Sequence, residues 1–219
     1  MGVRRGPWPS AGAMLFIALL VATVAAALVV AAPMAASLRS RGQATTFRGA
    51  VAEPPVPVPS IALTNERGQT ARLTDYRGQV VVLYFGYTSC PDVCPLTLQT
   101  IARARQALGR DGEQVRVLLI TVDPERDTPE RLASYLRLVD PTFGGLTGGA
   151  DALGEMYAAF GVRAEKEPTR AGAAGYTVAH SSVTFVVDRI GRVRLAYPVD
   201  LQPDDVAADL RILLREKVS

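Results

Sequence analysis

Cysteine, histidine and lysine are all scarce in this sequence. The 219 residues include two cysteines and one histidine, too few for the disulfide framework that stabilises small secreted domains. The two cysteines, Cys90 and Cys94, are therefore better explained as reactive or metal-binding residues. Lysine occurs only at Lys166 and Lys217 while arginine is abundant, which we attribute to the codon usage of a GC-rich bacterial genome.

Long basic runs and internal repeats are also absent from the sequence. The formal net charge is +3, but residues 1–59 alone carry +4, so the remainder carries −1. No basic segment could follow a phosphate backbone, and we expect no binding to nucleic acid. The chain is long enough for one domain and an N-terminal accessory segment.

A long apolar segment is present near the N-terminus. Residues 13–32 are uncharged and include Thr23 as their one polar residue, and Pro33 follows. About 20 helical residues span roughly 30 Å, the thickness of a bilayer core. This predicts a transmembrane anchor at residues 13–33 after a short N-terminus at residues 1–12. A cleaved signal peptide is the alternative, because residues 35–37 (AAS) resemble a cleavage site, but the run exceeds the usual signal core of about 7–15 residues.

The segment after the anchor has no periodic apolar pattern. Arginines flank both ends of the apolar run, at residues 4 and 5 and at residues 39 and 41, so charge alone leaves the orientation open. Residues 34–59 end in alternating prolines (EPPVPVP), a pattern that favours an extended polyproline spacer. We therefore predict a Pro-rich linker at 34–59 and a folded domain at 60–219.

The domain alternates between strand and helix patterns. Residues 80–87 (VVVLYFGY) and 115–122 are apolar and rich in β-branched residues, as expected for strands buried on both faces. Helices are predicted at 95–108, 128–139, 153–160 and 203–214, the second with Asp127 or Thr128 as its N-cap. A strand at 183–187 and a turn into 192–197 predict a hairpin. This order indicates an α/β, thioredoxin-like fold with a parallel βαβ unit.

The cysteines lie between the first buried strand and the helix after it. Sulfurs there meet unpaired backbone N–H groups, which lower thiol pKa values, and the thiolate is the form that binds metal or attacks a disulfide. The C-x-x-x-C spacing lets both sulfurs reach one ion or form a local disulfide. Two thiolates select Cu(I), or zinc if further ligands complete a tetrahedron. An ordinary buried pair is the alternative, which the position at a strand-to-helix junction disfavours.

Two further residues are candidates for the same site. His180, the one histidine, precedes the strand at 183–187, where thioredoxin-like oxidoreductases place a cis-proline against the cysteine loop. Two thiolates and this imidazole would form a three-ligand set that suits copper. Asp123 follows the second buried strand, and is either a supporting or partner-contacting carboxylate or a turn residue before Pro124.

Residues 60–219 resemble the Sco/SenC family of anchored copper-binding proteins, which have a thioredoxin fold and assist assembly of cytochrome c oxidase. Three motifs carry the resemblance: YFGYTSCPDVCP at 84–95, TVDPERDTP at 121–129 and YTVAHS at 176–181. The resemblance implies copper, as Cu(I) or Cu(II), bound by Cys90, Cys94 and His180, and a periplasmic domain on the bacterial inner membrane. Ala179 departs from the family, which commonly has Asp before the histidine, and this could alter copper affinity.

Three functions compete on this sequence. The first is a metallochaperone that delivers copper to the dinuclear site of oxidase subunit II, its partner together with another periplasmic copper carrier. The second is a thiol–disulfide reductase that uses a redox-active Cys90–Cys94 pair to keep the target's cysteines reduced. The third, a peroxiredoxin-type peroxidase, would need Thr or Ser three residues before its nucleophile, where Tyr87 and Pro91 stand instead. His180 favours metal binding, because dithiol exchange does not require an imidazole.

Overall fold

A computed structural model of the chain describes residues 46–168 and 175–217. Within these residues no helix has the length and apolar character that crossing a membrane requires. The anchor predicted at 13–33 and the N-terminus at 1–12 lie outside the described residues. The folded unit begins at Phe47.

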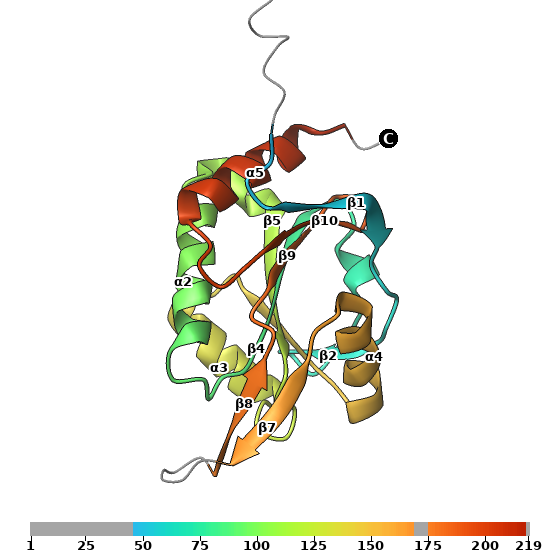
Figure 1. Ribbon diagram of the computed structural model, residues 1–219, viewed down its shortest axis with the longest axis vertical. Helices are drawn as coiled ribbons and strands as arrows, with labels where there is room; N and C mark the ends of the chain where they lie inside the picture. The colour runs from blue at the N-terminus through green and yellow to red at the C-terminus, as the bar shows by residue number, and fades with distance from the viewer. Residues whose placement is uncertain (1–45, 169–174, 218–219) are drawn as a thin grey trace, which may run out of the picture. The chain divides into compact units, whose positions relative to one another are not determined.

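The core of the unit is an eight-stranded mixed sheet with the strand order β1-β10-β9-β4-β5-β6-β2-β3. Helices α2, α3 and α5 lie on one side of it and α4 on the other (Figure 1). The strands of this sheet are β1 (Ala50–Pro57), β2 (Leu63–Asn65), β3 (Thr70–Ala71), β4 (Val80–Gly86), β5 (Val115–Thr121), β6 (Gly144–Thr147), β9 (Thr184–Val187) and β10 (Arg192–Tyr197).

The remaining elements are helices and one separate hairpin. A two-stranded antiparallel ribbon, β7–β8, stands apart from the main sheet. The bounds are α2 (Val93–Gln106), α3 (Pro129–Val139), α4 (Ala150–Phe160), α5 (Pro203–Arg215), the short 3₁₀ helices η1 (Leu73–Tyr76) and η2 (Gly109–Gln114), and the ribbon strands β7 (Ala164–Pro168) and β8 (Tyr176–His180).

The two central strands confirm the buried runs expected from the sequence. Every residue of β4 is buried, and β4 pairs in parallel with β5 from Val80–Val115 to Gly86–Thr121. Because successive side chains of a strand point to opposite faces, Tyr84 faces α2 while Phe85 packs on Phe160 of α4. The parallel register brings the carboxyl ends of β4 and β5 to one edge of the sheet. The loops that follow the two strands are therefore neighbours.

Helix α3 shows why the helix predictions succeeded. Thr128 is its N-cap, since the Thr128 side chain accepts a hydrogen bond from the Arg131 N–H, and Pro129 occupies the first helical position. Asp127, the other N-cap candidate, has a different role in the structure. Strand β6, by contrast, was not predicted. A Cβ at Gly145 would lie 3.0 Å from the Leu132 Cβ, so β6 needs glycine to pack against α3 despite the low strand propensity of glycine.

Residues 50–57, which the sequence placed in the Pro-rich spacer, form strand β1 in the structure. β1 pairs antiparallel with β10 at the edge of the sheet, and its register shifts between Val51 and Val56. An edge strand tolerates proline because one row of its N–H groups has no partner strand. The extended conformation was therefore predicted correctly, but these residues are part of the folded domain. The domain boundary lies near Phe47, ahead of the predicted Ser60.

A buried carboxylate fixes this N-terminal strand to the last helix. Asp209 of α5 is fully buried and accepts hydrogen bonds from the backbone N–H groups of Arg48 and Gly49 and from the Tyr197 hydroxyl. A buried carboxylate that loses its donors is strongly destabilised. A fragment beginning at Ser60 would remove two of these donors together with β1, so a soluble fragment needs to begin before Phe47.

Candidate metal centre

The cysteine loop connects β4 to α2, as the sequence predicts. Cys90 lies in the loop and is partly buried, while Cys94 lies in the first turn of α2 and is fully buried. The Cys94 N–H points at the Cys90 sulfur, 3.4 Å away. Both cysteines are free thiols in the structure. The helix N-terminus thus supplies the backbone donor that stabilises a thiolate at Cys90.

The two sulfurs form an asymmetric pair. A hydrogen bond from the Cys94 thiol is the largest cause that lowers the pKa of Cys90, to about 5. Burial opposes this shift, and the backbone N–H groups of Cys94 and Asp92 add to it. The same hydrogen bond to Cys90, followed by burial, raises the pKa of Cys94 above its usual range. One thiolate and one thiol therefore share a proton at neutral pH, with Cys90 as the reactive sulfur.

The underside of Cys94 is packed against β4. The Tyr84 hydroxyl lies 3.5 Å from the Cys94 sulfur, and burial raises the pKa of Tyr84, so this phenol stays protonated and can donate to the sulfur. A Cβ at Gly86 would lie 3.0 Å from the Cys94 sulfur and 2.7 Å from the Tyr84 ring. Glycine at position 86 is therefore what allows the cysteine to pack directly against the strand end.

His180 lies beside the cysteine loop, as the sequence predicts, and comes from the end of β8. The His180 Nε2 is 4.0 Å from the Cys94 sulfur, and the imidazole contacts the Tyr87 ring edge-on at 5.7 Å between centroids. The His180 Nδ1 lies 3.1 Å from the Val178 carbonyl oxygen. Because a carbonyl only accepts, Nδ1 carries the proton and Nε2 presents its lone pair toward the sulfur. This is the tautomer that a metal-ligating imidazole needs.

The Cys94 sulfur and the His180 Nε2 are donors of the kind that a soft ion prefers, and their separation can be compared with that of two ligands of one ion. With metal–sulfur and metal–nitrogen bonds of about 2.3 and 2.0 Å, two ligands of one ion at trigonal angles lie roughly 3.7 Å apart. The observed 4.0 Å between Cys94 and His180 is close to that separation. Within the described residues, however, no three Cys, His, Asp or Glu side chains already form a complete metal-holding cluster. The three side chains are thus neighbours at one edge of the sheet.

Asp123 is not exposed to a partner. It is fully buried and accepts a hydrogen bond of 2.7 Å from the Tyr176 hydroxyl, and it also pairs with Arg126. Contact with another protein, one of the roles that the sequence left open for Asp123, does not fit this burial. The carboxylate instead supports the hairpin that carries His180.

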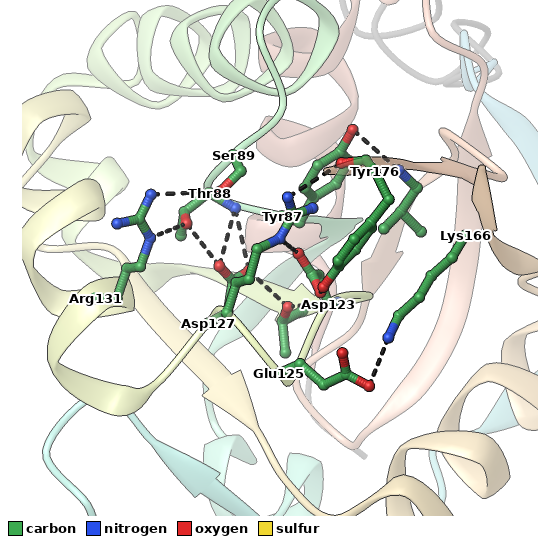
Figure 2. A network of polar contacts seen from close by, with 12 residues as sticks. Tyr87, Thr88, Ser89, Asp123, Glu125, Asp127, Arg131, Lys166 and Tyr176 are labelled. Carbon is green, nitrogen blue, oxygen red and sulfur yellow. Dashed lines mark hydrogen bonds and ion pairs between the residues drawn. The ribbon is translucent and has the colours of Figure 1, made fainter. Parts of the chain in front are cut away.

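Asp127 is a site residue that sequence reasoning missed. It is fully buried, and it accepts hydrogen bonds from the Thr88 N–H and hydroxyl in the cysteine loop and from the Thr121 hydroxyl of β5 (Figure 2). The sequence offered Asp127 only as a helix cap. Its position just after a buried strand, at the sheet edge that also holds the cysteine loop, is the signal that could have identified it.

Ala179 is exposed and lies opposite Glu165 in the hairpin. Adjacent residues of a strand point to opposite faces, so position 179 does not share the face of the His180 imidazole. A carboxylate there would lie on the solvent side of β8.

The asymmetry of the thiols gives a pH-dependent expectation. Because the pKa of Cys90 is lowered to about 5, its thiolate is present above that pH and is lost as the pH falls through it. One equivalent of iodoacetamide should therefore modify Cys90 before Cys94 at pH 7, with a rate midpoint near pH 5. Peptide mapping by mass spectrometry across pH 4–9 measures both. In Cys94→Ala the midpoint should move up, and a wild-type midpoint close to the ordinary thiol value of about 8.5 would contradict this assignment.

The fold and site define a class of protein: a thioredoxin-like domain in which two thiols and an imidazole meet at the carboxyl edge of the sheet. The sequence model described as SCO1/SenC matches residues 53–215, and the chain belongs to this family. A SCO2-like protein of Rickettsia prowazekii is 31% identical over 144 residues, which cover 66% of this chain and 70% of the relative.

Two solved structures show how far the similarity of fold extends. ScoI of Bradyrhizobium japonicum, solved with copper bound, is 35% identical with a TM-score of 0.65, and the match covers 72% of this chain and 99% of that one. The apo form of Sco1 from Thermus thermophilus is 41% identical with a TM-score of 0.69, covering 78% and 99%. The thioredoxin-like Sco fold predicted from the sequence is confirmed for the described domain.

Proposed function

We propose that this chain binds copper through Cys90, Cys94 and His180 and delivers it during assembly of cytochrome c oxidase, to the dinuclear copper site of subunit II. The observation that carries the proposal is the convergence of a thiolate, a thiol and an Nε2 lone pair at one sheet edge. Sulfur and imidazole donors together suit copper. ScoI of Bradyrhizobium japonicum, which is similar to this chain, was solved with copper bound, and this supports copper as the ion.

Delivery requires that the ion can leave the site. Cys90 and His180 are partly exposed while Cys94 is buried, so an incoming ligand meets the first two donors from solvent. A three-coordinate ion also leaves room for ligand exchange with a target. The anchor at 13–33, the linker and the periplasmic location on the inner membrane belong to this proposal and rest on the apolar N-terminal segment and the family resemblance.

A thiol–disulfide reductase is the second candidate, and one observation favours it. Cys90 combines a lowered pKa with partial exposure, as an attacking thiolate requires, and Cys94 is the adjacent thiol that could resolve a mixed disulfide. Both candidates use the same sulfurs. They differ in whether the imidazole is needed.

Oxidase assembly in cells that lack this protein separates the two candidates. We expect oxidase activity to be lost, to return when copper is added to the medium, and to return with the wild-type chain but not with Cys90→Ala. The absorbance of the oxidase copper site in purified membranes measures assembly, and the rate of oxygen consumption measures activity. Restoration by a membrane-permeant thiol reductant, with no response to copper, would replace delivery with the reductase function.

A further inference from the structure

The turn between β5 and α3, residues 123–127, contacts both segments that carry the candidate ligands. These are the cysteine loop, here called the sulfur arm, and the β7–β8 hairpin with His180, here called the imidazole arm. Its two carboxylates, Asp123 and Asp127, are fully buried. The turn is closed by hydrogen bonds from the Arg126 and Asp127 N–H groups to the Asp123 carbonyl oxygen, at 3.1 and 2.9 Å. Figure 2 shows the two carboxylates side by side, with partners on different segments. We call this segment the 123–127 turn.

Asp127 holds the sulfur arm. Its carboxylate accepts from the Thr88 hydroxyl at 2.6 Å and from the Thr88 N–H at 3.1 Å, and Thr88 lies two residues before Cys90. The Arg131 guanidinium donates to the same hydroxyl at 2.9 Å. The Thr121 hydroxyl fixes the other side of the carboxylate at 2.7 Å. Through Asp127, these bonds attach the cysteine loop to the carboxyl end of β5.

Asp123 holds the imidazole arm. Its carboxylate accepts the Tyr176 hydroxyl at 2.7 Å, and Arg126, which pairs with Asp123, donates to the Tyr176 carbonyl oxygen at 3.1 Å. The Arg126 guanidinium also stacks on the Tyr176 ring, 3.8 Å from its centroid. Tyr176 begins β8 and His180 ends it. The hairpin is a sheet of its own, separate from the main sheet. These bonds attach it to the body of the domain at Tyr176, the end of β8 opposite to His180.

We infer that the 123–127 turn sets the separation between the sulfurs and the imidazole, with Tyr176 and Arg126 as positioning residues that act through His180. Both carboxylates belong to one closed turn, so the sulfur arm and the imidazole arm are hydrogen-bonded to the same short segment. Hydrogen bonds to buried carboxylates are strong and are costly to break. The cysteine loop and the hairpin also touch directly, because the Tyr87 ring packs on His180 and the Tyr87 hydroxyl accepts the Val178 N–H at 3.3 Å. A change at Tyr176, which lies at the opposite end of β8, should therefore act chiefly on the imidazole that this strand carries. The inference rests on the proposed function, in which Cys90, Cys94 and His180 hold the ion.

A double-mutant cycle on the purified full-length chain tests the inference. Tyr176→Phe should raise the Kd for Cu(II) by about tenfold, in the range found for residues that orient metal ligands, and should shift the thiolate-to-Cu(II) charge-transfer band. In the His180→Ala background the same substitution should have no further effect, because its influence is transmitted by the imidazole. Arg126→Lys, which keeps the charge but loses the planar stack and fork, should also raise the Kd for Cu(II). Part of its effect should remain in the His180→Ala background, because the guanidinium also lies 5.7 Å from the ring centroid of Tyr87 in the cysteine loop.

Two controls separate positioning from general stability. Tyr197→Phe removes the same kind of bond, from a tyrosine hydroxyl to the buried carboxylate of Asp209. This bond involves neither the cysteine loop nor the hairpin, so the variant should leave the Kd for Cu(I) and the Kd for Cu(II) unchanged. Thr88→Val should weaken Cu(I) and Cu(II) in both the wild-type and His180→Ala backgrounds, since Thr88 belongs to the sulfur arm. Thermal unfolding identifies any variant that loses its fold.

The outcomes distinguish failure of the positioning role from failure of the proposed copper-binding function. Equal effects of Tyr176→Phe in the two backgrounds, or no effect in either, would overturn the positioning role while leaving copper binding intact. A wild-type chain that takes up no copper would overturn the proposed function, and the positioning role with it.

Discussion

Replacing either cysteine with alanine should abolish tight binding of Cu(I). A soft ion held by two sulfurs loses half of its preferred ligands, and the remaining imidazole is a weaker ligand for Cu(I) than a thiolate. We expect the Kd to rise by about a thousandfold or more, equivalent to roughly 4 kcal/mol of binding free energy. Competition of the full-length chain with a chromophoric Cu(I) chelator measures the affinity, and the wild type should saturate near one ion per chain.

A matched control for this prediction is available on the other face of the sheet. Met156 of α4 carries another buried sulfur. The substitution Met156→Leu removes this sulfur and nearly conserves the volume of the side chain. This variant should bind Cu(I) as the wild type does. If Cys90→Ala and Cys94→Ala also retain wild-type affinity, the ion is bound elsewhere in the chain.

His180→Ala should separate the metal function from the thiol function. The imidazole suits Cu(II), whereas two thiolates already satisfy Cu(I), so Cu(II) binding should weaken by at least about a hundredfold, close to 3 kcal/mol. Cu(I) binding should fall much less. Exchange of the Cys90–Cys94 pair with a small disulfide should remain close to the wild-type rate, because the causes that lower the pKa of Cys90 are dominated by Cys94 and its backbone, with His180 the smallest of them.

Titration with Cu(II), monitored by the sulfur-to-copper charge-transfer band, and stopped-flow measurement of disulfide exchange provide the two readouts. Equal losses of copper binding and exchange would argue that the imidazole supports the whole loop and does not act as a ligand. A wild-type charge-transfer spectrum in His180→Ala would remove His180 from the ligand set.

The fold could be predicted from the sequence where local pattern and tertiary burial agree. The all-apolar run of β4 and the Thr128–Pro129 start of α3 each carry their own signal. Strand β1 and strand β6 carry misleading ones, since prolines suggest a spacer and two adjacent glycines suggest a loop. β1 becomes a strand because β10 offers it an edge, and β6 because Gly145 leaves room for Leu132 and Leu136 of α3. Neither partner is visible in the local sequence.

The site divides in the same way. Cys90, Cys94 and His180 were identified because their residue types are rare in this chain and carry particular chemistry, and the structure brings the three together. The hairpin that carries His180 was not predicted, because β7 is exposed throughout and has no apolar alternation. Asp127 was assigned to the wrong task for a related reason. Its partner Thr88 is 39 residues away, and only the parallel register of β4 and β5 makes the two neighbours.

The single proton shared by the two sulfurs has a consequence for the exchange of cargo. If an ion binds both sulfurs, as proposed, it must displace the hydrogen held by Cys94, so loading would release a hydrogen ion and unloading would take one up. An acidic surrounding would then favour release of the ion, and an alkaline one would favour its retention.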